Sequence, residues 1–485
     1  MQSRIFIAVS PNASLNDALD LEAAHYSILT KREGSRRHRA VMRRDLSSGE
    51  TDRRTSKQAA MRMPFWRAST PAIMLALICL APIRGAGAGE RPDANASSGL
   101  TRTEVYRQVK ELADLGRRLF ADPALSGSGK MSCAACHDPA HGFAPANALS
   151  VQLGGRNLDR SGIRAVPTLT YKQATPQFTE HFHDSDDEGD ESVDAGPTGG
   201  LTWDGRVDQL SKQALIPLFS PIEMANDDRA ALVAALEANY GAALRGILGQ
   251  RMPQGPEGAL TAAAKALEAY QQTAEEFFPY SSKYDAFLRG KAELSAAEKR
   301  GLALFEDPAK GNCASCHISA PRKPGTLPQF TDDGLIALGA PRNIDIPANQ
   351  DPDFFDLGLC GPERADFRDR ADYCGLFKTP TLRNVALRQV FFHNGGAQSL
   401  REAIAFYVER DVKPEKWYPR RADGAIAKFD DLPAQYHQNI NNDPPFGGNP
   451  GDAPALSKAE IDDIAAFLET LTDGFASPSR EAAGR

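Results

Sequence analysis

The sequence predicts a mainly α-helical protein built from two tandem, related units with long loops. Three observations favour this fold class. Apolar residues recur at helical spacing in three segments, and motifs of the first half return in the second half in the same order. The segments between them are rich in Gly, Pro, Asp and Asn, and no run of alternating strands stands out. We therefore expect helices that pack within each unit, and few strands.

Three helices are expected from apolar spacing and capping signals. The first ends at Asp122-Pro123, and its apolar face consists of Val105, Val109, Leu112, Leu115 and Leu119. The second begins at the capping-box pair Ser295 and Glu298 and ends at Asp307-Pro308. The third begins at the similar pair Ser457 and Glu460, and its apolar face consists of Ile461, Ile464, Phe467, Leu468 and Leu471.

The internal repeat pairs four motifs of the first unit with four of the second. The first unit contains, in order, Leu119-Phe120-x-Asp122-Pro123, Cys133-x-x-Cys136-His137, Pro167-Thr168-Leu169 and Trp203-Asp204-Gly205. The second unit contains Leu304-Phe305-x-Asp307-Pro308, Cys313-x-x-Cys316-His317, Pro380-Thr381-Leu382 and His393-Asn394-Gly395. A leucine follows each last glycine by five residues. We place the boundary near residues 289–293, which predicts an N-terminal domain at 89–290 and a C-terminal domain at 291–485.

The first 88 residues are not expected to belong to the folded protein. Residues 1–60 are polar and Arg-rich, which indicates a non-native upstream extension or a disordered segment, with the true start at Met61 or Met63. Residues 61–88 have the order of a secretory signal peptide: a basic start, the apolar core 72–81, and Ala86-Gly87-Ala88. We expect cleavage near Ala88 and a periplasmic protein. The alternative is a buried helix behind a genuine N-terminal domain.

Composition argues against several functional classes. The chain has 485 residues, and no apolar run approaches the roughly 20 residues that a membrane-spanning helix needs. Its net charge of −7 argues against nucleic-acid binding, which requires a basic face. Residues 1–88 carry 14 basic and 7 acidic side chains, so their removal would leave a net charge of −14. This acidity could attract a basic partner protein or serve solubility alone.

The strongest chemical signal is the repeated Cys-x-x-Cys-His motif. Two thiols one helical turn apart can bind both vinyl groups of a haem, and the adjoining histidine can ligate its iron. We therefore expect two covalently bound haem c groups, attached and ligated by Cys133, Cys136, His137, Cys313, Cys316 and His317. Two zinc clusters are the alternative, although each would need a further ligand nearby. Cys360 and Cys374 could form a disulfide or stay as free buried thiols.

The ligand on the other side of each haem decides between electron transfer and catalysis. Met252 is the last methionine, so the second unit contains none. Its remaining candidates are His393, His437, Lys378 and several tyrosines. The first unit offers His141, His181 and His183. Spacing alone selects none of these residues. The acidic stretch 184–194 is expected to be a solvated loop.

Residues 101–475 resemble the bacterial di-haem cytochrome c peroxidase and MauG superfamily. Besides both haem motifs, the resemblance rests on Trp203-Asp-Gly-Arg206, Gln213, Pro221-Ile-Glu223-Met224, Pro380-Thr-Leu-Arg-Asn384 and Phe392-His-Asn-Gly395, in the family's order. It implies two tandem cytochrome c-like haem domains. The N-terminal haem, on His137, would react with peroxide, and the C-terminal haem, on His317, would transfer electrons. Gln213 and Glu223 would line the peroxide pocket, and Trp203 would lie between the haems.

The chemistry of these residues agrees with the implied roles, although each has an ordinary alternative. A carboxylate in a poorly solvated haem pocket, such as Glu223, can move the protons that peroxide cleavage requires, because burial raises its pKa. Without the resemblance, such a glutamate would usually lie on the surface. Gln213 can orient peroxide by hydrogen bonding, but most helical glutamines face water. Trp203 is oxidisable and could shorten the electron path, although it could also be a core residue.

Departures from the peroxidase pattern point to the MauG branch. Tyr407 occupies the position that carries Met in the peroxidases, and the MauG branch has Tyr there. The segment Leu153-Gly-Gly-Arg156 lacks the histidine that many peroxidases place on the resting iron. This favours an open iron, although His181 or His183 could still bind it. Residues 164–167 lack the Asn of the family's calcium site, which puts calcium in doubt.

A phenolate ligand favours Fe(III) and higher states, whereas a thioether favours Fe(II). Tyr407 would therefore favour a high-valent di-haem state. We expect a periplasmic enzyme that reduces hydrogen peroxide at the N-terminal haem, with electrons relayed through the C-terminal haem from a small c-type cytochrome or cupredoxin. The alternatives are a MauG-like maturase that oxidises residues of a partner protein, and a non-catalytic di-haem electron carrier. We expect no nucleic acid and no stable membrane anchor, and a homodimer is an open alternative.

Overall fold

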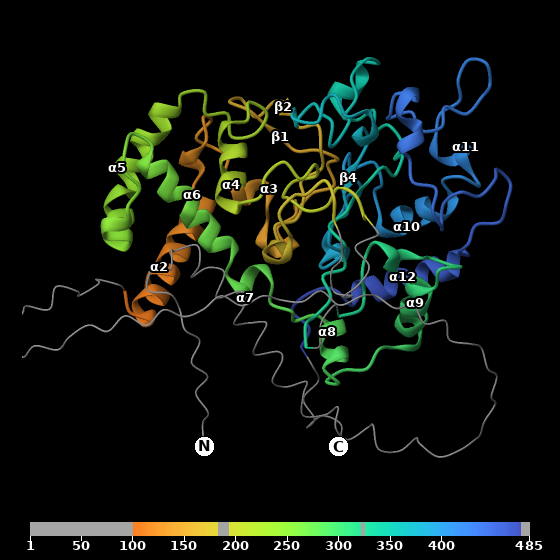
Figure 1. Ribbon diagram of the computed structural model, residues 1–485, viewed down its shortest axis with the longest axis horizontal. Coiled ribbons are helices and arrows are strands. Elements are labelled where there is room, and N and C mark those ends of the chain that lie inside the picture. The colour runs from red at the N-terminus through yellow and green to blue at the C-terminus, as the bar shows by residue number, and fades with distance from the viewer. Residues whose placement is uncertain (1–99, 183–193, 322–324, 477–485) are drawn as a thin grey trace, which may run out of the picture. The chain divides into compact units, whose positions relative to one another are not determined.

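The computed structural model describes residues 100–182, 194–321 and 325–476, and this part of the chain is mainly helical, as predicted (Figure 1). Its α-helices are α2 Arg102–Ala121, α3 Cys133–Cys136, α4 Leu210–Phe219, α5 Arg229–Leu248, α6 Gly258–Gln271, α7 Ala274–Phe277, α8 Lys283–Leu288, α9 Ala296–Glu306, α10 Leu400–Glu409, α11 Pro414–Trp417 and α12 Lys458–Glu469. Its strands are β1 Leu153–Gly154, β2 Arg160–Ser161, β3 Leu335–Ile336 and β4 Phe377–Lys378. Short 3-10 helices occupy some of the connections, among them η5 Cys313–Ser315 and η9 Ala434–Asn439.

The three helices predicted from the sequence are confirmed. Helix α2 begins after the N-cap Thr101, whose side chain accepts the Glu104 N–H, and ends at Asp122. Helices α9 and α12 both begin with complete capping boxes, formed by Ser295 with Glu298 and by Ser457 with Glu460. In each box the serine and glutamate side chains satisfy backbone N–H groups that the first helical turn leaves open.

Helices α4, α5, α6 and α10 were not predicted. Helix α6 is buried along most of its length, and much of its surface is alanine, so it shows little of the one-sided apolar pattern that identifies a helix in sequence. Helix α4 contains Pro217, which a sequence pattern takes as a helix breaker. Tertiary packing therefore decides these helices more than local pattern does.

Each half contains one close helix crossing at a glycine. Helix α2 crosses α6 at Gly116, where an added Cβ would lie 1.9 Å from the carbonyl oxygen of Ala266. Helix α9 crosses α12 at Gly301, where it would lie 2.0 Å from the carbonyl oxygen of Asp463. Each glycine precedes a buried phenylalanine, Phe120 or Phe305, by four residues. Absence of a side chain at both positions lets the two backbones approach.

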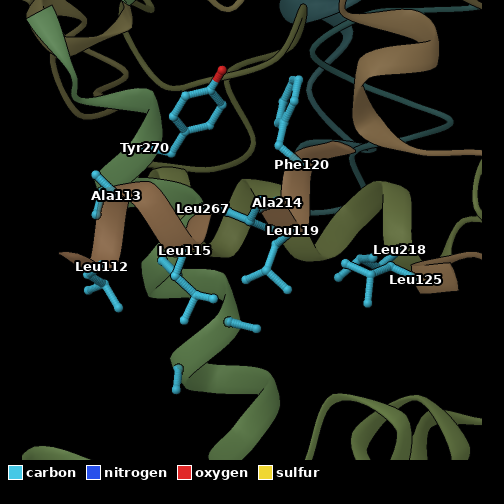
Figure 2. Packing of buried hydrophobic residues seen from close by; sticks show 14 of the residues in the cluster. Leu112, Ala113, Leu115, Leu119, Phe120, Leu125, Ala214, Leu218, Leu267 and Tyr270 are labelled. Atoms are coloured by element: carbon cyan, nitrogen blue, oxygen red, sulfur yellow. The ribbon is translucent and has the colours of Figure 1, made fainter. Parts of the chain in front are cut away.

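The buried apolar residues form three clusters. The first draws on residues 105–280 and includes the crossing of α2 with α6, whose packed side chains are shown in Figure 2. The second draws on residues 284–471 and surrounds α9, α10 and α12. The smaller third cluster contains a disulfide between Cys360 and Cys374, so these residues are not free thiols. The predicted domain boundary near residue 290 remains a prediction.

The strands are short and local. Strand β1 pairs antiparallel with β2, and β3 pairs antiparallel with β4 through Leu335 with Lys378 and Ile336 with Phe377. Across the described ranges, none of the helices is both long and apolar enough to cross a membrane. The predicted extension at 1–60, the predicted signal peptide at 61–88 and His183 lie outside the described residues.

Candidate haem sites

Both Cys-x-x-Cys-His motifs follow the first long helix of their half. Helix α3 holds Cys133 and Cys136, and the N–H of His137 donates to the carbonyl of Cys133 at 2.9 Å. In the second motif η5 begins at Cys313, and the N–H of His317 donates to the Cys313 carbonyl at 2.8 Å. Each motif is therefore a single turn that presents two thiols and an imidazole together, as covalent haem attachment requires.

The two histidines are held in the same way. Nδ1 of His137 lies 3.0 Å from the carbonyl oxygen of Phe143, and Nδ1 of His317 lies 3.0 Å from that of Phe330. Phe143 and Phe330 both have left-handed backbones, with φ of 56° and 55°. A carbonyl that accepts from Nδ1–H fixes the tautomer and orientation of a ligating imidazole and directs Nε2 to the metal. Both sites therefore carry the usual support of a haem-ligating histidine.

The repeated Pro-Thr-Leu triplets support these carbonyl-bearing turns. The hydroxyl of Thr168 donates to the carbonyl of Gly142 at 2.5 Å, and the hydroxyl of Thr381 donates to that of Gln329 at 2.6 Å. Gly142 and Gln329 directly precede the two phenylalanines. Sequence reasoning found the triplets but assigned them no role. Their repetition before the Trp/His turn of each unit was the available signal.

A cavity of about 430 Å³ adjoins the second motif. Cys313, Cys316, His317 and Tyr407 all line it, together with apolar side chains of both halves. Ligand cavities in proteins have volumes of this order, mostly apolar walls and few polar groups. The structure thus brings the predicted second-haem residues to one space.

Tyr407 is fixed from behind by an aromatic stack. It lies in α10, and its ring stacks on Phe446 with centroids 5.4 Å apart. The side chain of Arg410 is fully buried, and its guanidinium lies 3.7 Å from the centroid of the Phe446 ring. Burial raises the pKa of the Tyr407 phenol well above its ordinary value. A bound ferric ion would supply the nearby positive charge that a buried phenolate needs.

Glu223 lies beside the first motif. Its charge acts on the thiols of both Cys133 and Cys136, and its backbone carbonyl accepts the Gly155 N–H at 2.7 Å. Glu223 is exposed to solvent in the structure, but protein lies close enough around its carboxyl group to raise the pKa, against the lowering effect of a hydrogen bond from Ser220. A carboxylate beside a haem-binding motif with a raised pKa is suited to proton transfer.

Trp203 lies where the two halves meet. Its indole N–H donates to the carbonyl of Ala165 at 2.7 Å, and its own carbonyl accepts the Lys378 N–H at 2.8 Å. In return, the Ala165 N–H donates to the carbonyl of His393 at 2.7 Å. Ala165 and Lys378 each stand two residues before a Pro-Thr-Leu triplet, so the two halves exchange equivalent backbone bonds. Trp203 and Gln213 both line the cavity that reaches the second motif.

Helices α4 and α10 occupy equivalent places in the two halves but carry different residues. Each begins at the leucine five residues after the last repeated glycine, at Leu210 and Leu400. Counting from these leucines, Pro217 stands where the second half has Tyr407, and Gln213 stands where it has Ala403. Proline has no side-chain atom that can ligate iron. The first half therefore lacks the counterpart of Tyr407.

Several other candidate ligands are engaged elsewhere. Nδ1 of His181 lies 2.5 Å from Asp194 on a side chain that is 69% exposed, and His141 pairs with Asp138 at 2.8 Å. His437 bonds to the carbonyl of Leu432 at 2.8 Å. His393 stacks on Phe377 at 3.6 Å, and Lys378 lies 3.3 Å from Asp333. These partners hold the histidines without requiring a metal.

Arg164 lies in the segment for which the resemblance left calcium in doubt. Its buried guanidinium pairs with Asp204 at 2.7 Å and with Asp356 at 2.6 Å. Within the described ranges, no three His, Cys, Asp or Glu side chains are grouped so that they could hold a metal ion. Because an arginine already neutralises both carboxylates, this arrangement does not favour a further cation there.

The cavity also has cationic walls, of which sequence reasoning named only Lys378, as a candidate iron ligand. Lys172, Lys378 and Arg388 line it, and Arg388 donates to the carbonyl of Val166 at 3.0 Å. Burial lowers the pKa of Lys172 to about 7 and that of Arg388 to about 10. Buried cations are costly unless an anion faces them. The propionates of a bound haem would supply such anions, so the residues present fit that cofactor.

Comparison with known proteins agrees with two haem-binding motifs in this chain, because the matches are di-haem proteins and their relatives. A family model described as di-haem cytochrome c peroxidase matches residues 110–293. The methylamine utilization protein MauG of Paracoccus denitrificans is 35% identical over 425 residues, which cover 82% of this chain and 96% of that protein. The cytochrome c551 peroxidase of Nitrosomonas europaea is 28% identical over 302 residues, which cover 62% of this chain and 73% of that protein.

A solved structure is also similar. The crystal structure of the diheme peroxidase BthA from Burkholderia thailandensis superposes with a TM-score of 0.65 at 41% sequence identity. The match covers 75% of this chain and 86% of that one.

Proposed function

Because this chain belongs to the di-haem cytochrome c peroxidase family, which includes the MauG proteins, we propose that it reduces hydrogen peroxide at the N-terminal haem, held by His137. The electrons arrive through the C-terminal haem, held by His317 and Tyr407, from a small c-type cytochrome or cupredoxin. The enzyme is an oxidoreductase. The observation that carries the proposal is the difference between α4 and α10, which gives the second site a ligand residue and the first site none.

The residues around the first site divide the work. A haem iron held by His137 would supply the position for peroxide and the electrons for its reduction. Glu223 takes a proton from the incoming peroxide and returns one to the departing oxygen, a role for which a carboxylate of raised pKa is suited. Gln213 orients the peroxide through its side-chain amide. Trp203, bonded to both halves, shortens the electron path between the sites.

Turnover by the purified protein with both haems attached tests the proposal. We expect rapid consumption of hydrogen peroxide when a reduced small c-type cytochrome or a reduced cupredoxin is present, and a change in the optical and EPR spectra of a high-spin haem on peroxide addition alone. Two low-spin haems that do not respond to peroxide would instead identify a non-catalytic electron carrier and overturn the proposal.

A MauG-like maturase is the second candidate. It is favoured by the match to MauG across 96% of that protein and by Tyr407, which would stabilise a high-valent di-haem state. A maturase passes its oxidising power to residues of a partner protein. Purification of the protein from its source with bound partners, followed by peroxide and mass spectrometry, separates the candidates. New covalent oxidation of a partner with poor cytochrome turnover would select the maturase.

We propose a periplasmic location for the mature protein, without residues 1–88. The disulfide between Cys360 and Cys374 supports this location, because structural disulfides form in oxidising compartments. We also propose the division into haem domains at 89–290 and 291–485, which the separate apolar clusters support. A homodimer stays an open alternative, and light scattering of the holoprotein tests it.

A further inference from the structure

A line of aromatic residues leads away from the first haem site. The centroid of the Phe120 ring lies 6.5 Å from that of the His137 imidazole, and the centroid of the Tyr270 ring lies 5.4 Å from that of Phe120. Phe120 comes from α2 and Tyr270 from α6, which cross at Gly116, where an added Cβ would lie 2.8 Å from the Cβ of Tyr270. Figure 2 shows the two rings extending to the same side of this crossing.

The line ends near the surface at a proton acceptor. The Tyr270 ring is buried, but its hydroxyl donates to the carboxylate of Glu276 at 2.7 Å. Glu276 also pairs with Arg117, whose guanidinium lies 5.4 Å from the Tyr270 ring centroid. The Glu276 side chain is 22% exposed and that of Arg117 58% exposed. An oxidisable ring thus connects the interior of the first site with solvent.

Chemistry gives this arrangement a specific capability. A phenol that loses one electron becomes a strong acid, so its oxidation is easy only where a base can take the proton at once. A carboxylate at hydrogen-bond distance is such a base. The ion pair with Arg117 fixes the position of the Glu276 carboxylate. The positive charge of Arg117 would oppose a cationic tyrosine but not a neutral tyrosyl radical.

Tyrosine–carboxylate bonds occur elsewhere in the described residues, so the bond alone does not single out Tyr270. Tyr171 bonds to Asp473, but Arg383 lies over its ring in a fully buried ion pair with Asp285. Tyr373 bonds to Glu180 at 3.0 Å, and it belongs to the apolar cluster of the disulfide. Tyr270 combines the bond with ring contact to Phe120, which itself packs beside a haem-motif histidine.

We propose that Tyr270 is a redox-active outlet of the first haem site. The proposal rests on the proposed peroxidase function, which supplies the oxidising equivalent. One electron passes from Tyr270 to the oxidised site, the phenolic proton moves to Glu276, and a neutral tyrosyl radical remains. A phenolic donor at the surface beside Arg117 then gives one electron to the Tyr270 radical and releases its own phenolic proton to solvent, while Glu276 returns the stored proton to Tyr270. This route serves small one-electron donors and spares other residues from oxidation.

Peroxide added to the holoprotein without a donor tests the proposal, followed by rapid freezing, EPR and optical spectra. We expect a tyrosyl radical in the wild type that Tyr270→Phe abolishes and Glu276→Gln diminishes, since an amide cannot accept the proton. Tyr270→Phe keeps the ring that packs on Phe120. If Tyr270→Phe is unstable, the radical signal of Glu276→Gln provides an independent test. The matched control Tyr373→Phe removes another carboxylate-bonded phenol and should keep the radical. Oxidation of hydroquinone should fall in the first two variants alone.

The outcomes separate this proposal from the one it rests on. A haem spectrum that does not respond to peroxide in the wild type overturns both. A haem that responds without forming a tyrosyl radical, or with a radical that persists in Tyr270→Phe, overturns the outlet and leaves the peroxidase standing. Trapping with a nitroso spin trap and peptide mapping should place the adduct on Tyr270; an adduct confined to other residues also counts against the outlet.

Discussion

The two haem units are alike around the haem-motif histidine, but they differ in the residues of the equivalent helices α4 and α10. Each unit holds its histidine through a phenylalanine carbonyl 3.0 Å away, and each braces that turn with a threonine hydroxyl. Helices α4 and α10 carry different residues at equivalent positions. Pro217 of α4 corresponds to Tyr407 of α10, and Gln213 corresponds to Ala403. The duplicated chain has therefore kept the framework that carries the cofactor and changed the side chains that set its reactivity.

Under the proposed function, this difference would assign peroxide reduction to the first half and electron transfer to the second. A site closed by a tyrosine has no place for peroxide but can hold a high oxidation state. A site without that ligand, with Glu223 beside its Cys pair, can bind a small oxidant and move protons. The residue equivalent to Glu223, counted from the helix starts, is Lys413, which pairs with Glu409 at 2.8 Å. The proposed acid–base group therefore has no carboxylate counterpart at the equivalent position of the second unit.

Glu223→Gln should give the largest effect. The amide keeps the size of the side chain but cannot take a proton, so peroxide reduction should slow by about 10²- to 10⁴-fold, the usual contribution of a positioned acid–base group. Stopped-flow spectra of the peroxide reaction measure it. The matched change in the other unit, Lys413→Gln, should leave the rate unaltered. Equal losses in both variants would contradict the assignment of proton transfer to the first unit.

The same residue predicts the pH dependence. Burial raises the pKa of Glu223 above its ordinary value, and the proton-accepting form is the carboxylate. The rate of the peroxide reaction should therefore fall as the pH drops through this raised pKa, at a higher pH than an ordinary glutamate would give. This acid limb should be missing from the profile of Glu223→Gln. A limb that persists in the variant would belong to another group.

Tyr407→Met should make the second unit resemble an electron-transfer cytochrome. A thioether favours Fe(II), so the potential of one haem should rise by something on the order of 0.1 V, within the roughly 0.8 V that axial ligands span. Redox titration followed optically measures the shift. Tyr418→Phe is the matched control, because Tyr418 is also buried but bonds to the carbonyl of Gly339 at 2.5 Å. Unchanged potentials and spectra in Tyr407→Met would remove Tyr407 as the ligand.

Sequence reasoning found the parts of this comparison that depend on residue type. Cysteine pairs, histidines and capping boxes are rare patterns with direct physical meaning, so the two haem motifs and helices α2, α9 and α12 could be predicted. The difference between Tyr407 and a peroxidase methionine was also visible in sequence. Its meaning became clearer only when α4 and α10 aligned Tyr407 with Pro217.

The parts that sequence reasoning missed depend on backbone groups and distant packing. Any residue has a carbonyl, so nothing in the letters marks Phe143 and Phe330 as the partners of the histidines. Their spacing from the histidines also differs, at six and thirteen residues. Helix α6 has a uniform, alanine-rich surface, so its sequence shows little of the one-sided apolar pattern from which a helix could be predicted. The cations Lys172 and Arg388 come from opposite halves of the chain. Tertiary structure alone brings these residues together.

The smallest expected effect tests whether the shared framework is equivalent in both units. Thr168→Val and Thr381→Val each remove a hydroxyl that donates to a turn carbonyl and accepts a backbone N–H, from Thr170 and Arg383 respectively, at 3.1 Å. Valine keeps the shape but leaves both backbone groups unpaired, which should lower the free energy of unfolding by about 1–3 kcal/mol in either variant. Denaturant unfolding of the holoprotein measures the loss. Similar losses, with the haem of the altered unit alone changing its spectrum, would support a common framework. A loss confined to one unit would mean that the repeat is preserved in sequence but has separate structural roles in the two halves.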